Sequence, residues 1–199
     1  MSDLKQIKQM RNPDYPILPL FLERWSPRSF EIREIPEDVL YSLFEAARWA
    51  PSASNLQPWQ FIIARTSEDR ERFLSFILEG NTRWCKQASA FALLVSNKLK
   101  PDGGDNRNNA FDAGTCWGYL ALEAANQGLA AHAMAGFNAE KARETLAIPE
   151  QYELHCVIAI GYRASADQLP DDLREREVPS GRRPLEETLH EGRFGAKPE

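Results

Sequence analysis

The amino-acid sequence predicts a single α+β domain over residues 1–199, built from one sheet with helices around it. Three observations support this prediction. The chain is long enough to bury a substantial core. Segments with helical apolar spacing and short apolar runs typical of strands are interleaved along it. No internal repeat or low-complexity tract interrupts this order.

The first half of the chain contains the clearest helix boundaries. Pro36 suits the first position of a helix, which must end by Ala50 because a proline follows. Residues 61–64 form a short β-branched run and predict a strand. Ser67 and Gly80 predict the N-cap and the end of a second helix. Residues 91–96 predict a second strand.

The second half begins with an exposed loop over residues 97–109, which is nearly free of apolar side chains. A helix is predicted over about 110–127, and its buried side is expected to contain Phe111, Trp117, Leu120, Ala121, Ala124 and Ala125. It is followed by a strand over 131–134, a helix from the Asn138 cap to about 147, and a strand over 155–162. The segment 165–199 has 15 charged residues among 35 and cannot form a core of its own. It predicts either disorder or an arm laid on another surface.

Composition excludes several classes of protein. The net charge of −5 argues against general nucleic-acid binding. No apolar run approaches the roughly 20 residues of a membrane-spanning helix, and no signal-peptide core is present at the start. The three cysteines are too far apart in sequence for a metal cluster or a disulfide framework, which favours the cytoplasm. We therefore expect no nucleic-acid, membrane or metal partner.

Two arginine-containing segments are candidates for anion binding. Residues 24–30 place Arg24, Ser26 and Arg28 at alternate positions, which share one side of an extended chain. Two guanidinium groups and a hydroxyl suit a phosphate, although a solvated basic edge strand would look the same. Arg182 and Arg183 form a second pair, for which a surface charge run is the alternative.

Two further segments are rich in small and polar residues. Residues 132–137 run from a strand end into a capped helix, where free backbone N–H groups can bind a ligand and Gly136 permits close approach. An ordinary turn is the alternative, and His132 beside it is more often structural than catalytic. The loop over residues 50–61 is longer and more polar than a simple connection requires.

The sequence contains none of the common nucleotide-binding loops and none of the common hydrolase or metalloprotease motifs.

Taken together, these segments resemble the nitroreductase family of FMN-dependent oxidoreductases over nearly the whole chain. Two motifs are specific in combination, Arg-x-Ser-x-Arg at 24–28 and Pro-Ser-x-x-Asn-x-Gln-Pro-Trp at 51–59. They are followed at the right distances by Ala-Gly-Phe at 135–137 and by Arg-x-Pro at 182–184. The resemblance implies a homodimer with a mainly antiparallel sheet, a C-terminal arm (about 165–199) exchanged between subunits, and two FMN sites at the interface.

The resemblance also implies which residues bind FMN. Arg24 and Arg182 would hold the phosphate with Trp25 and Ser26 close by, and Arg28 would lie near N1 and O2 of the ring, where it stabilises the charge of reduced flavin. Asn81 and the N–H groups of Ala135 and Gly136 would face the polar edge of the ring. Pro51, Ser52 and Asn55 would reach the FMN of the partner subunit.

The expected reaction is ping-pong hydride transfer from NAD(P)H to an electrophilic acceptor such as a nitroaromatic or a quinone, with no side chain acting as acid or base.

Two departures from the family pattern bear on the site. Ser180 stands where many relatives have lysine, and Arg183 would be the substitute cation. Ala135 stands where some relatives have glutamate. The alternatives are an FMN-dependent dehydrogenase of one metabolite, a flavin-consuming enzyme, an FMN protein occluded by loop 97–109, and a cofactor-free scaffold.

Overall fold

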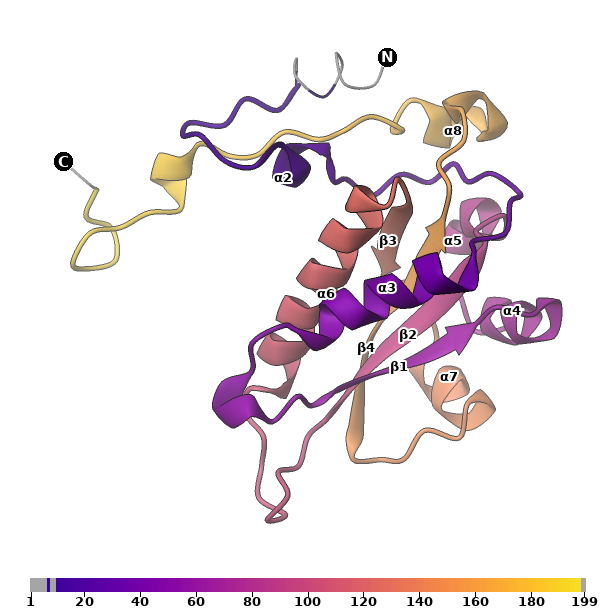
Figure 1. Ribbon diagram of the computed structural model, residues 1–199, viewed down its shortest axis with the longest axis horizontal. Helices are drawn as coiled ribbons and strands as arrows, with labels where there is room; N and C mark the ends of the chain where they lie inside the picture. The colour runs from indigo at the N-terminus through magenta and orange to yellow at the C-terminus, as the bar shows by residue number, and fades with distance from the viewer. Residues whose placement is uncertain (1–6, 8–9, 198–199) are drawn as a thin grey trace.

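The computed structural model describes residue 7 and residues 10–197, and its centre is a four-stranded antiparallel sheet (Figure 1). The strands are β1 (Trp59–Ala64), β2 (Ala90–Asn97), β3 (Ala130–Met134) and β4 (Tyr152–Gly161). Their order in the sheet is β1-β2-β4-β3, and all three pairings are antiparallel. The predicted α+β fold with an antiparallel sheet is confirmed.

Helices cover both faces of the sheet. On one face lie α3 (Glu37–Arg48) and α6 (Asn109–Asn126), which cross the sheet side by side in Figure 1. The other face is covered by α4 (Ser67–Leu74), α5 (Glu79–Cys85), α7 (Ala139–Thr145) and α8 (Asp171–Arg174). The short α2 (Pro19–Glu23) contacts α6. None of the helices in the described part of the chain is long and apolar enough to cross a membrane.

The two-sided core explains why β2 is a continuous apolar run. Phe91, Leu93 and Val95 point to the face covered by α4 and α5, whereas Ala92 and Leu94 point to α3 and α6. Successive side chains of a strand alternate between faces, so a strand buried on both sides needs apolar residues at every position. All five side chains are buried.

The predicted helix over residues 67–80 is wrong, because the chain forms two helices there. Helix α4 ends at Leu74 and α5 begins at Glu79, so that Gly80 lies inside a helix. Between them Ile77 makes an antiparallel bridge with Phe137, and the Phe76 carbonyl accepts a hydrogen bond from the Asn138 N–H. These contacts with a distant segment interrupt the helix.

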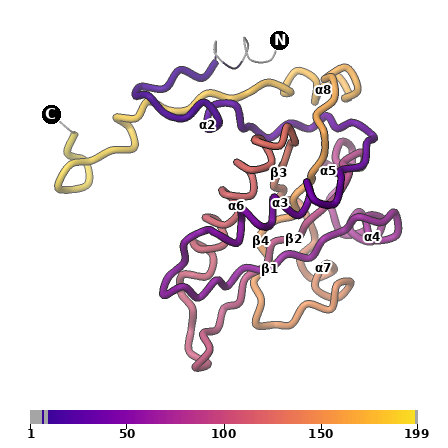
Figure 2. The backbone as a smooth tube through the Cα atoms, in the orientation of Figure 1, coloured from indigo at the N-terminus to yellow at the C-terminus, as the bar shows by residue number. Residues whose placement is uncertain are grey.

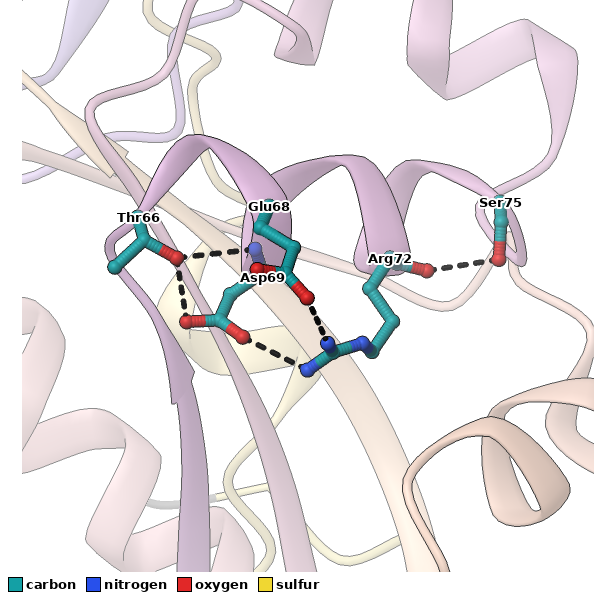
Figure 3. Close-up of polar contacts among 5 residues, drawn as sticks. All are labelled: Thr66, Glu68, Asp69, Arg72 and Ser75. Carbon is teal, nitrogen blue, oxygen red and sulfur yellow. Dashed lines mark hydrogen bonds and ion pairs between the residues drawn. The ribbon is translucent and has the colours of Figure 1, made fainter.

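The N-cap of α4 is Thr66 and not the predicted Ser67. The Thr66 hydroxyl accepts a hydrogen bond from the Asp69 N–H at 3.1 Å and donates to the Asp69 carboxylate at 2.7 Å (Figure 3). Arg72 pairs with Glu68 and Asp69 one turn later, on the exposed side of the helix. Similarly, Pro36 is the N-cap of α3 and not its first helical residue.

Helix α6 follows its predicted range closely, and Leu120, Ala121 and Ala124 are buried as predicted, but the prediction is wrong for Phe111. Phe111 is 77% exposed, whereas the neighbouring Asp112 is only 2% exposed. Trp117 and Ala125 are half-buried. In the first turn the buried side chain is therefore the carboxylate of Asp112 and not the predicted Phe111.

Loop 97–109 is folded back on itself and closely anchored at its base. Leu99 and Asp105 form an antiparallel bridge, and Gly103 takes a φ of +84° at the tip. Asn106 is 3% exposed, and its N–H donates to the Lys98 carbonyl at 2.7 Å. The residues at the tip are exposed as predicted, but the buried asparagine is not what a solvent-exposed loop would contain.

The two ends of the described chain run side by side away from the sheet (Figure 2). The Arg11 Nε donates to the Ser180 carbonyl at 2.9 Å, and the Leu185 N–H donates to the Asp14 carboxylate at 3.2 Å. The segment 165–174 packs against the sheet through buried Leu169 and Leu173. Beyond it, large apolar side chains of both ends are exposed: Tyr15, Ile17, Leu18, Phe21, Leu185, Leu189 and Phe194.

Candidate functional site

Residues 24–30 form an extended segment with the predicted alternation. Trp25, Pro27 and Ser29 are buried, while the intervening Arg24, Ser26 and Arg28 are partly exposed. The guanidinium of Arg163 lies 4.8 Å from the centroid of the Trp25 ring. The segment is also tied to the chain after β4, because the Ser29 carbonyl accepts a hydrogen bond from the Ala164 N–H at 3.0 Å. Three polar side chains are thus held on one side, as a phosphate site requires.

A cationic cluster forms where this segment meets the C-terminal arm, from Arg24, Arg182 and Arg11. Burial, followed by the positive charge of Arg182, lowers the pKa of Arg24. Burial and then the charges of Arg182 and Arg24 lower the pKa of Arg11. Arg24 also donates to the Ser26 hydroxyl at 3.3 Å. Within the described residues no carboxylate pairs with Arg24 or Arg182, so the cluster suits an external anion.

Arg11 itself acts as a brace. Its guanidinium donates to the carbonyls of Leu22 and Arg24 at 2.7 Å each and to that of Ser180 at 2.9 Å. The residue is 8% exposed. Arg11 thus holds the arm against the segment that carries Arg24, while its charge adds to the positive potential of the cluster.

Glu177 fixes the backbone of the same segment from the arm side. Its carboxylate is 5% exposed and accepts hydrogen bonds from the N–H groups of Arg28 and Ser29 at 2.8–2.9 Å. The guanidinium of Arg28 makes no hydrogen bond among the residues that the structure describes. Burial is the main cause that lowers the pKa of Arg28, followed by Arg176, while Glu177 opposes the shift.

His132 connects β3 to the arginine segment. Its Nδ1 lies 2.8 Å from the Pro27 carbonyl, and its ring packs on that of Trp84 with centroids 4.5 Å apart. Burial is the main cause that lowers the pKa of His132 to about 4; the charges of Arg28 and Arg24 act in the same direction, and hydrogen bonds to the backbone of Pro27 and Ser26 oppose the shift. The ring is therefore neutral near pH 7, and Nδ1–H donates to the carbonyl. This geometry favours the structural role over a catalytic one.

Asn81 and Gly136 are in direct contact. The Asn81 amide donates to the Gly136 carbonyl at 3.1 Å. A Cβ at Gly136 would lie 2.5 Å from the Asn81 Nδ2, so a larger residue here would displace the Asn81 amide. Among the described residues, neither the Ala135 nor the Gly136 N–H donates a hydrogen bond. Both amides remain free to bind an acceptor on a ligand.

The loop over residues 51–57 holds a strained conformation. Ser54, Asn55 and Gln57 have positive φ angles of 51°, 55° and 45°. The Ser52 hydroxyl accepts a hydrogen bond from the Gln57 N–H at 3.0 Å, and the Gln57 side chain donates to the Asn55 side-chain oxygen at 3.0 Å. Such strain in residues other than glycine is typical of functional loops.

The predicted site residues thus fall into two groups within one chain. The first contains Arg24, Trp25, Ser26, Arg28, Asn81, Ala135, Gly136 and Arg182, connected through His132 and Trp84. The second contains Pro51, Ser52 and Asn55, which lie at the end of α6 away from α2 (Figure 1).

A sequence model of the nitroreductase family matches residues 22–90 and 82–162. The chain belongs to this family. An oxidoreductase whose crystal structure is described as containing FMN superposes with a TM-score of 0.90 at 42% identity, over 94% of this chain and 97% of that one.

Two curated relatives of this nitroreductase-family chain are more distant. A putative NADH dehydrogenase/NAD(P)H nitroreductase of Streptomyces coelicolor is 28% identical over 76% of this chain and 86% of its own. A protein of Lactiplantibacillus plantarum named CLA biosynthesis enone reductase is 26% identical, over 79% of this chain and 89% of its own.

Proposed function

We propose that this chain is an FMN-dependent oxidoreductase that takes electrons from NAD(P)H and delivers them to a small electrophilic acceptor. The observation that carries the proposal is the cationic cluster of Arg24 and Arg182 beside Ser26, which pairs with no carboxylate of residues 10–197. The similarity to an FMN-containing oxidoreductase at 42% identity supports it. When bound, FMN supplies two-electron hydride chemistry, for which no acidic or basic side chain is needed.

The residues of the first group fit this cofactor. Arg24, Arg182 and Ser26 bind the phosphate through charge-assisted hydrogen bonds. Arg28, whose backbone is held by Glu177, places its cation beside N1 and O2 and stabilises negative charge there. The free N–H groups of Ala135 and Gly136 and the amide of Asn81 bind the polar edge of the ring.

The second group is supplied by a partner subunit in a homodimer. Loop 51–57, which carries this group, is bonded to the start of α6, whereas α2 lies toward the other end of that helix (Figure 1), so in this proposal a second copy provides the loop. The arm contacts its own chain through Glu177 and Ser180, so exchange between subunits is limited to the part beyond Arg182. The exposed apolar side chains at both chain ends, such as Tyr15, Leu18 and Phe194, favour burial of these ends against the second subunit. We infer a two-fold dimer with two equivalent sites.

The acceptor is a nitroaromatic or a quinone, and it enters after the oxidised nicotinamide leaves, in ping-pong order. The relative named as an enone reductase favours a second candidate, in which the acceptor is one dedicated metabolite with an electron-poor double bond. All three cysteines are free, which supports the cytoplasm as the compartment.

A visible spectrum of the purified protein, recorded before and after anaerobic addition of NADH or NADPH, tests the proposal. Flavin absorption that bleaches on addition is expected. Arg24→Ala and Arg182→Ala are expected to weaken FMN binding strongly. Arg72→Ala serves as the control, because Arg72 is an exposed arginine of α4 that pairs with Glu68 and Asp69 outside the cluster. A colourless protein that takes up no added FMN would overturn the proposal.

A further inference from the structure

We propose that Asp112 is a positioning residue, which fixes loop 51–57 so that this loop completes the cofactor site of the other subunit. The inference rests on the proposed function. Asp112 lies in the first turn of α6, is 2% exposed, and accepts a hydrogen bond from the Ala53 N–H with its two oxygens at 3.2 and 3.3 Å. A buried carboxylate is costly unless it binds something, although the helix N-terminus stabilises it in part.

The bond to Ala53 is the external support of a strained loop. Within residues 51–57 the other hydrogen bonds of the described chain join loop residues to each other, such as Gln57 to Ser52 and to Asn55. The next anchor lies outside the loop, where the Asn97 N–H donates to the Pro58 carbonyl at 2.9 Å. Left-handed backbone at residues other than glycine persists only where the surroundings enforce it.

The position of Asp112 means that it acts on a site other than the one in its own chain. Pro51 and Asn55 are exposed and face away from the sheet core. Helix α6 has 18 residues and is about 27 Å long, and Asp112 lies at its start whereas α2 and Arg24 lie toward the other end. A loop that is already ordered in the free protein binds without a further entropic cost. Asp112 thus raises the cofactor affinity of the partner subunit.

Mixed dimers test this assignment. Asp112→Ala and Arg24→Ala chains carry different affinity tags, are expressed together, and are purified over both tags, and FMN affinity is measured by fluorescence quenching. Each homodimer is expected to bind FMN at least ten-fold more weakly than wild type. The mixed dimer contains one site with an intact Arg24 and a loop held by an intact Asp112. It is expected to bind one FMN per dimer with wild-type affinity.

Two further variants separate positioning from general destabilisation. Asp112→Asn keeps an acceptor oxygen and is expected to restore much of the affinity, while Asp105→Ala, which removes an exposed carboxylate nearby, is expected to change nothing. Hydrogen exchange of the Ala53 amide is expected to speed up in Asp112→Ala without FMN present.

Each contrary outcome has a distinct meaning. Wild-type affinity of the Asp112→Ala homodimer would overturn the inference alone, and so would a mixed dimer that binds no better than its parents. Unchanged exchange at Ala53 would also overturn it, because the bond would then not order the loop. A wild-type protein without affinity for FMN would overturn the proposed function and this inference together.

Discussion

Glu177→Gln is expected to destabilise the protein and to loosen the segment that presents Arg28. The carboxylate makes three short contacts to two backbone N–H groups in a buried place. A hydrogen bond to a charged group contributes about 1.5–3 kcal/mol. Glutamine keeps one acceptor oxygen and turns an NH₂ group toward the second N–H. We therefore expect a loss of about 2–4 kcal/mol, which lowers the melting temperature of a chain of this size by roughly 4–16 °C.

The assay is thermal unfolding followed by circular dichroism at one fixed protein concentration, because dimer formation makes the midpoint depend on concentration. Glu175→Gln is the matched control, since Glu175 lies two residues earlier in the same arm and is exposed. Its effect is expected to stay within about 0.5 kcal/mol. If the two variants melt at the same temperature, the buried carboxylate does not hold the segment and the reasoning fails.

Three other substitutions test single contacts. The pKa of His132 is about 4 in the folded state and near 6.5 when unfolded, so the unfolded chain binds a proton more readily than the folded one. The free energy of unfolding should therefore fall by about 3 kcal/mol as the pH drops from about 6.5 to 4. Urea titrations at several pH values should show a smaller fall for His132→Gln. Gly136→Ala places a Cβ against the Asn81 amide, and FMN titration should show weaker binding with little change in melting temperature. Thr66→Ala should cost about 1 kcal/mol in urea unfolding, whereas Ser67→Ala should not, and the reverse order would contradict the assigned cap.

Local patterns predicted the parts of the molecule that depend on neighbours in sequence. The alternation of Arg24, Ser26 and Arg28 followed from the two-residue period of extended chain, and the structure shows the same alternation of exposure. The cap of α4 was assigned one residue late, because Thr66 and Ser67 carry equivalent hydroxyls and the path of the backbone decides between them.

The long-range parts had no local signal. Arg11 binds a carbonyl 169 positions away, and Glu177 binds N–H groups 149 and 148 positions away. Charged residues whose partners are backbone groups look like ordinary surface charges in a sequence. Phe111 was expected in the core because its apolar side chain fits the helical spacing. In the fold the neighbouring Asp112 is buried instead, where it binds the Ala53 N–H, and this long-range contact has no local signal in the sequence.

The cationic cluster also sets an order of events during synthesis, because its parts come from opposite ends of the chain. Arg24 and Arg182 are 158 positions apart. At about 5–20 residues per second, a ribosome takes roughly 8–30 s to pass from one to the other. If the proposed phosphate site is right, a nascent chain carries only half of it until Arg182 has been made. A chain truncated before Arg182 is then expected to bind FMN more weakly than the full chain.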